Sequence, residues 1–299
     1  KKKEEKKKKV SNYMEEVKND KDILYLKNHE SGTDKKLPLL HYNLLDKTGI
    51  VDHCFTTREG GASEGIFSEL NLSFTRGDED AAVTENYRRL AYAFNTTLDN
   101  FVCSDQTHTV NVMRVDEMHR GMGVICPKTY SDIDGLITNV PGIVLSTFYA
   151  DCVPLFFIDT VNKAIGLSHS GWRGTVNRMG FHTIEAMKRE FGTKAEDIVA
   201  AVGPSICMDC YEISEDVADE FKKAFAGHEE EILLDKGNGK YQLDLWKSNE
   251  IVLKEAGVKE ENIAISNICT CCNPKLLFSH RASQGKRGNL GAFLVLRNS

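Results

Sequence analysis

Hydrophobic residues along this chain alternate between helical spacing and the nearly continuous runs that are typical of buried strands. In the segment 82–95 every third or fourth residue is apolar, and the same spacing recurs over 176–191, where Gly192 can end the helix. The runs 142–149 and 154–158 are almost continuously apolar, which predicts strands covered on both faces. Weaker signals predict helices at 214–225 and 243–256 and strands at 100–102, 198–202, 263–266, 276–278 and 292–296.

This alternation of strands and helices predicts an α/β fold with mixed strand order. No internal repeat or interdomain linker interrupts the chain after about residue 37, so residues 37–299 are predicted to form a single domain. Residues 1–36 are interpreted as a charged N-terminal extension, either disordered or left from expression cloning. The reasons are that the first nine residues are all charged and that 28–36 has turn composition.

Composition narrows the classes of function. The chain has 299 residues, of which 41% are hydrophobic, and this is enough to bury a sizeable core. A formal net charge of −6 argues against binding nucleic acid and favours a small-molecule substrate. Nine cysteines without a secretory signal predict free thiols and a cytoplasmic location, and the apolar runs are too short to cross a membrane.

Cys152 and His169 stand at the ends of two neighbouring apolar runs, so they can meet at one edge of a sheet. A thiol and an imidazole are zinc ligands, and they are also the partners in a thiolate nucleophile. His108, again at the boundary of a predicted strand, would be a third ligand. One thiolate and two imidazoles resemble catalytic zinc, which has three protein ligands and an open position where bound water becomes acidic.

The turn 169–175 is itself a candidate anion site. Small residues and glycines follow His169, and a helix is predicted to begin near Thr175. Its N-terminal backbone N–H groups would attract an anion, and the guanidinium of Arg173 could pair with a phosphate or carboxylate. Pairing of Arg173 with a structural carboxylate is the alternative.

Several ordered motifs together support a resemblance to a known family. The motifs are Thr57-Arg58-Glu59-Gly60-Gly61, Leu70-Asn71-Leu72, Gln106-Thr107-His108, Ala150-Asp151-Cys152, His169-Ser170-Gly171-Trp172-Arg173-Gly174, Gly203-Pro204-Ser205-Ile206, Cys269-Thr270 and Phe278-Ser279-His280-Arg281. From about residue 50 to the C-terminus the chain resembles the laccase-domain family. That family is also labelled multicopper polyphenol oxidoreductase or YfiH-like, and is now regarded as purine nucleoside phosphorylases.

The resemblance implies a single α/β domain, a layered α/β/β/α sandwich of mixed sheets related to cytotoxic necrotizing factor catalytic domains. It places the family's metal ligands on His108, Cys152 and His169. The implied activity is phosphorolysis of adenosine, inosine and 5′-methylthioadenosine, with adenosine deamination as a companion. The older laccase label implies copper. Because no His-x-His pairs are present to build a copper cluster, we expect zinc, with copper adventitious.

The expected mechanism assigns roles to five further residues. Phosphate is expected to bind Arg173 and Arg58, and Asn71 and Arg281 are predicted to join the substrate or phosphate site. Asp151 is expected to act beside Cys152 by orienting a ligand or the ribose. Purine nucleosides and phosphate are the expected partners, with neither nucleic acid nor membrane, and the chain is expected to be a monomer or homodimer.

Two other readings of the site stay open. Cys152 could be a thiolate nucleophile activated by His169 in a hydrolase or deamidase, or the three ligands could form a non-enzymatic zinc module in a partner-binding protein. A second metal is also conceivable, because Cys207 and Cys210 have C-x₂-C spacing. The later group Cys269, Cys271 and Cys272 shows no clean second knuckle, which disfavours that metal.

Overall fold

Two six-stranded sheets form the centre of the protein, whose computed structural model describes residues 23–298. From edge to edge, the first sheet consists of β1 (Leu24–Glu30), β2 (Lys36–Tyr42), β3 (Val51–Thr56), β15 (Leu290–Leu296), β7 (Val144–Tyr149) and β4 (Phe101–Cys103). Its neighbouring strands are antiparallel except β4 and β7, which are parallel. The sheet thus joins strands from both ends of the chain.

The second sheet also has six strands. From edge to edge it consists of β14 (Ile263–Ile265), β10 (Ile198–Val202), β8 (Val153–Asp159), β9 (Ala164–Ser170), β6 (Gly135–Thr138) and β5 (Val112–Arg114). The pairs β10–β14 and β5–β6 are parallel and the others antiparallel. Every residue of β8 and β9 is buried, which explains why 154–158 is apolar without alternation.

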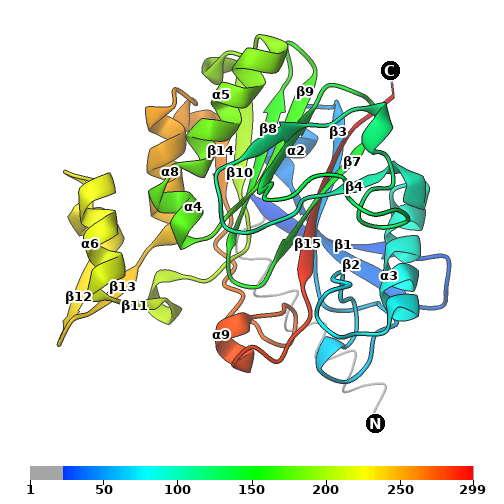
Figure 1. Ribbon diagram of the computed structural model, residues 1–299, viewed down its shortest axis with the longest axis horizontal. Coiled ribbons are helices and arrows are strands. Elements are labelled where there is room, and N and C mark those ends of the chain that lie inside the picture. The colour runs from blue at the N-terminus through cyan, green and yellow to red at the C-terminus, as the bar shows by residue number, and fades with distance from the viewer. Residues whose placement is uncertain (1–22, 299) are drawn as a thin grey trace.

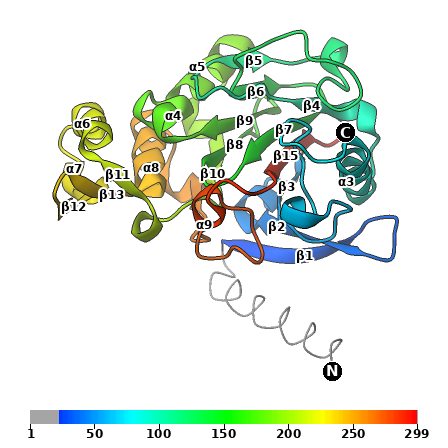
Figure 2. The same cartoon turned by 60° about the horizontal axis from the view of Figure 1, so that its bottom comes forward.

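Helices cover the outer faces of the two sheets, as Figure 2 shows. Helix α3 (Asp80–Ala93) packs on the first sheet, whereas α4 (Trp172–Val176), α5 (Met179–Phe191) and α8 (Leu245–Glu255) pack on the second. A hydrophobic core also fills the space between the two sheets. It contains Phe55 and Leu294 from the first sheet and Phe156 from the second. The predicted α/β/β/α sandwich of mixed sheets is confirmed.

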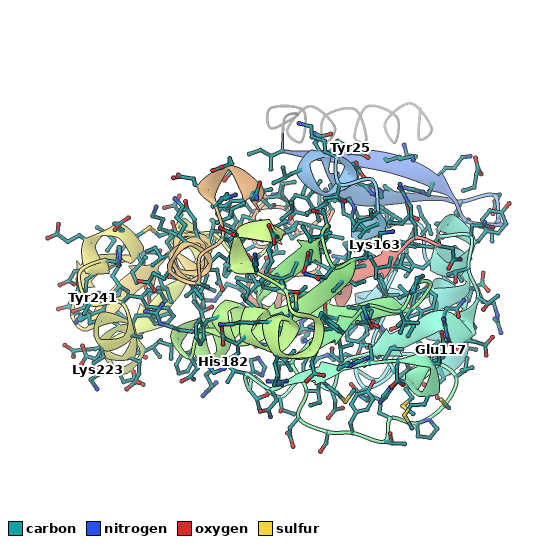
Figure 3. The ribbon with its side chains drawn as sticks, turned by 90° about the horizontal axis from the view of Figure 1, so that it is seen from above. Tyr25, Glu117, Lys163, His182, Lys223 and Tyr241 are labelled. Atoms are coloured by element: carbon teal, nitrogen blue, oxygen red, sulfur yellow. The ribbon has the colours of Figure 1, made fainter. Side chains whose placement is uncertain are left out.

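A small lobe projects beside α8 at one end of the molecule (Figure 1). It contains the sheet β11 (Glu212–Ser214), β13 (Lys240–Leu243) and β12 (Leu233–Gly237) with helices α6 (Glu215–Ala224) and α7 (Glu229–Ile232). Figure 3 shows Lys223 and Tyr241 together at this end. Two further short α-helices among the described residues are α2 (Asn43–Asp46) and α9 (His280–Ser283). Among residues 23–298, no helix has both the length and the apolar character needed to cross a bilayer.

Three local features differ from the sequence prediction. Residues 24–30, assigned to the charged extension, form β1, and all seven pair with β2, so the sheet begins well before residue 37. Residues 1–22 of the predicted extension lie outside the described residues. The helix expected over 176–191 begins three residues later, as α5 at Met179, because α4 ends at Val176 and Arg178 between them adopts the left-handed conformation. The predicted strand 276–278 is a buried turn followed by coil, with no strand partner.

Phe156 lies in the core between the two sheets, and its replacement tests how much this core contributes to the free energy of unfolding. Phe156 is fully buried and contacts the rings of Tyr42 and His53. Replacing it by alanine leaves a cavity, so Phe156→Ala is expected to lower the free energy of unfolding by about 3–5 kcal/mol. Phe181→Ala is the matched control, since Phe181 is 41% exposed on α5, and should cost less than about 1 kcal/mol. Urea denaturation measures both, and equal losses would contradict this account of the core.

Candidate active site

Strand pairing brings Cys152 and His169 together. Cys152 immediately precedes β8, His169 is the penultimate residue of β9, and these two strands are antiparallel, with Pro154 opposite His169. The start of one strand and the end of the next therefore share one edge of the second sheet. His169 is buried, whereas Cys152 is partly exposed. The thiol can thus be reached from solvent beside a ring held in the core.

His108 reaches the same edge from a loop between β4 and β5. Its backbone is in the left-handed region, with φ of 67°. The His108 Nε2 atom lies 4.0 Å from the Cys152 Sγ atom, and the His108 and His169 rings are nearly perpendicular with centroids 5.0 Å apart. One ligand atom from each of the three side chains lies within 4.8 Å of the other two. This Cys/His₂ set is a donor combination that suits zinc.

A buried carboxylate, Asp134, contacts the backbone at His108 and the ring of His169. It accepts hydrogen bonds from the backbone N–H groups of Thr107, His108 and Thr109 at 3.0, 3.1 and 2.9 Å. Its Oδ1 also lies 2.7 Å from His169 Nδ1. Because a carboxylate accepts, the proton of the neutral His169 ring sits on Nδ1 and the Nε2 lone pair is free for a metal.

Electrostatics favour a thiolate on Cys152 paired with a protonated His169. Burial alone would raise the pKa of Cys152, but the adjacent His169 charge and hydrogen bonds from both histidines lower that pKa to about 6. Burial alone would lower the pKa of His169, but the Cys152 thiolate and Asp134 raise it to about 9. For Asp134, the hydrogen bond and charge of His169 outweigh burial and lower the carboxyl pKa. The thiol is therefore a thiolate at neutral pH.

The three side chains line a cavity of about 430 Å³. That volume is typical of small-molecule sites, which are often lined by aromatic groups and a few charged ones. Aromatic side chains in this cavity include Phe74 and Phe148, and its cationic side chains are Arg76, Lys128 and Arg287. The Lys128 ammonium already pairs with Asp105. The arginines therefore carry the positive charge that is available to a ligand.

Arg287 has the most unusual environment of the cavity's cations. Its Nε atom is buried and has no hydrogen-bond partner among the described residues, and its Nη1 donates to the Gly288 carbonyl and the Asn289 side chain. Burial, followed by the charge of Arg76, lowers the pKa of Arg287 to about 10. A buried guanidinium N–H without a partner is costly unless a ligand accepts from it. This group is suited to an anion.

Two of the arginines expected to bind phosphate already have backbone partners. The Arg58 guanidinium donates to the carbonyls of Ser68 and Pro274. Arg281 donates to two carbonyls in the segment 210–212. Neither residue lines the cavity beside the three ligands. The structure thus gives both arginines contacts that hold loops together.

The other two predicted substrate residues also lie outside the cavity lining. Asn71 is buried, donates to Asp78 and the Ser73 carbonyl, and accepts from the Ser73 N–H. Arg173 is exposed and lies over the Trp172 ring, 4.4 Å from its centroid. Helix α4, which contains Arg173, is five residues long.

Asp151 adjoins Cys152 but has hydrogen bonds that point to a structural contact. Its two carboxylate oxygens accept from the Thr270 hydroxyl and the Arg281 backbone N–H, both at 2.7 Å. Its φ is 91°, a left-handed value that a non-glycine residue rarely adopts. The side chain thus ties the turn before Cys152 to a distant loop.

Sequence reasoning missed Asp134 and Arg287. A signal for Asp134 was present, because an acidic residue directly before the apolar segment 135–137 stands where a strand begins. Arg287 sits in a loop of mixed polar residues between α9 and β15, and nothing in its spacing distinguishes it from the other arginines. Only the folded chain shows that Arg287 lines the cavity.

Comparison with known proteins identifies relatives of this chain. Purine nucleoside phosphorylase YlmD of Bacillus subtilis (strain 168) is 36% identical over 246 residues, covering 82% of this chain and 88% of that protein. Adenosine deaminase RL5 of an unknown prokaryotic organism is 35% identical, covering 77% of this chain and 88% of that protein. The similarity therefore extends over most of each sequence.

A solved structure has the same architecture. The crystal structure of Bacillus licheniformis hypothetical protein YfiH superposes with a TM-score of 0.83 at 32% identity, covering 87% of this chain and 96% of that one. Residues 52–297 match the family described as multi-copper polyphenol oxidoreductase laccase. As the sequence motifs predicted, this chain belongs to that family.

Proposed function

We propose that this protein is a purine nucleoside phosphorylase that cleaves adenosine, inosine and 5′-methylthioadenosine with phosphate. The observation that carries the proposal is one cavity that combines a Cys/His₂ ligand set with the half-buried Arg287, whose Nε has no hydrogen-bond partner among the described residues. The cavity volume of about 430 Å³ is in the range of small-molecule sites. The names of relatives such as YlmD of Bacillus subtilis support the same reaction.

His108, Cys152 and His169 would hold one zinc ion. A Cys/His₂ set leaves one position of a tetrahedral zinc open for substrate or water. When bound, zinc supplies Lewis-acid polarisation and lowers the pKa of coordinated water. The candidate metal groups among residues 23–298 comprise this set and a four-cysteine group. Neither offers the many histidines of a multicopper oxidase, which favours zinc over the copper chemistry of the family's label.

Phosphate would bind at the cationic wall of the cavity. Arg287 offers an N–H without a partner, and Arg76 contributes a second guanidinium nearby. A forked guanidinium matches the geometry of phosphate oxygens. The partly buried ring of Phe148 would provide an apolar face for the purine. Phosphate oxygen then attacks C1′ of the ribose, the C1′–N9 bond breaks, and the purine leaves with the proton that hydrogen phosphate gives up.

Adenosine deamination is the proposed companion activity. In that reaction water replaces the amino group at C6 of adenine, and inosine and ammonia are released. A Cys/His zinc site of this kind performs deamination in other folds. The similarity to adenosine deaminase RL5 supports this activity in the same cavity.

A thiol hydrolase is the second candidate function. It is favoured by the low pKa of Cys152, about 6, beside a histidine that is oriented by Asp134. Nucleophile, imidazole and orienting carboxylate are the parts of an activated cysteine. The zinc proposal and this alternative differ in whether a metal is required.

Metal removal separates these two candidates. We expect chelation to abolish phosphate-dependent release of hypoxanthine from inosine, and stoichiometric zinc to restore it. Cys152→Ala should lower kcat/KM by more than about 100-fold, because even residues that merely support metal ligands cost about 10–100-fold. Cys126→Ala is the control, since Cys126 lies outside both groups of metal ligands. Full activity in metal-free protein would reject the zinc site, and full activity of Cys152→Ala would reject the site altogether.

The position of phosphate can be tested by comparing two arginines. Arg287→Gln is expected to raise the KM for phosphate by about 10–100-fold, since a hydrogen bond to a charged group contributes about 1.5–3 kcal/mol. Arg173→Gln removes a cation that does not line the cavity and should change this KM less than about threefold. Initial rates at varied phosphate concentration measure both. The reverse ranking would place phosphate near Arg173, as the sequence alone suggested.

A further inference from the structure

Four cysteines outside the proposed active site converge from two distant parts of the chain. Cys207 and Cys210 follow β10, and Cys269 and Cys272 follow β14. Strands β10 and β14 are parallel neighbours, so the segments after them leave the sheet at the same edge. A parallel bridge between Ser205 and Cys269 extends this pairing to the cysteines.

The four sulfur atoms have the spacing of a metal tetrahedron. Each Sγ atom lies within 4.8 Å of the other three. The Cys210–Cys272 and Cys207–Cys272 separations are 3.4 and 3.9 Å. Sulfurs bound tetrahedrally to zinc at about 2.3 Å are about 3.8 Å apart, between these two values. All four cysteines are free thiols in the structure.

Backbone contacts also resemble those of a metal knuckle. The Cys269 Sγ atom accepts hydrogen bonds from the N–H groups of Cys207 and Cys272, at 3.2 and 3.4 Å. Such contacts favour a negatively charged sulfur. Cys269 and Cys272 form the second C-x₂-C pair that sequence reading overlooked, because Cys271 stands between them and lies outside the cluster.

We propose that Cys207, Cys210, Cys269 and Cys272 bind a structural zinc ion. Two C-x₂-C pairs with four thiolates form a closed site, and such sites stabilise folds rather than bind substrate. A closed set leaves no open position for a reacting water. This assignment is independent of the nucleoside chemistry proposed above.

The proposed zinc would fix the segments that support Cys152. Thr270, which lies between two of the cysteines, donates its hydroxyl proton to Asp151 at 2.7 Å. The Ile206 N–H, next to Cys207, donates to the Asp151 carbonyl at 3.0 Å. Both contacts end on the residue before Cys152. The four-cysteine zinc is therefore expected to position the turn that presents the active-site thiol.

The site can be tested by metal content in a protein whose other site is disabled. In His108→Ala/Cys152→Ala protein, we expect one zinc per chain by plasma mass spectrometry. X-ray absorption at the zinc edge should show four sulfur ligands at about 2.3 Å. Adding Cys210→Ser should release this zinc. Adding Cys271→Ser is the matched control and should retain it, because Cys271 is outside the cluster.

A second measurement uses the unmodified protein, in case Cys210→Ser fails to fold. Native alkylation followed by mass spectrometry should spare all four cysteines until a chelator is added.

Any of four results would overturn the zinc proposal. They are the absence of zinc even after incubation with zinc salt, zinc with nitrogen or oxygen ligands only, stoichiometric iron in place of zinc, and a Cys210–Cys272 disulfide in freshly reduced protein.

Discussion

The buried carboxylate of Asp134 is the interaction on which the candidate active site depends. It lies directly before β6 and meets both the 107–109 loop and His169 on β9. A buried charge is costly unless hydrogen bonds compensate it, and here three backbone N–H groups and one imidazole do so. The same contacts hold His108 in a left-handed backbone conformation and fix the tautomer of His169. One compensated charge thus positions two of the three proposed zinc ligands.

The topology of the second sheet places the two proposed metal sites close together. Strand β8 is antiparallel to both β9 and β10, so its start lies beside the end of each. Cys152 precedes β8, His169 lies near the end of β9, and the Cys207 segment follows β10. The Ile206–Asp151 and Thr270–Asp151 hydrogen bonds join the two sites. In this arrangement the proposed four-cysteine zinc would stabilise the turn that presents Cys152 to the proposed active-site zinc.

Sequence analysis predicted much of the fold and the proposed ligand set. The continuous apolar runs identified β7 and β8, and the positions of Cys152 before β8 and His169 near the end of β9 indicated a shared edge. The sequence prediction placed β1 in the N-terminal extension because β1 is a largely polar edge strand. It also overlooked the helix break at Arg178, because that break depends on backbone conformation. Sequence reading also left Arg287 out, since only tertiary packing distinguishes one buried guanidinium from exposed ones.

The zinc affinity of Asp134→Asn protein shows whether Asp134 assembles the three-ligand site. Competition with a chromophoric chelator gives that affinity, with Cys152→Ala protein as the baseline for all other bound zinc. Circular dichroism confirms that the variant is folded at the temperature used. We expect an affinity about 10–100-fold weaker than that of the unmodified protein. An unchanged affinity in folded Asp134→Asn protein would contradict it.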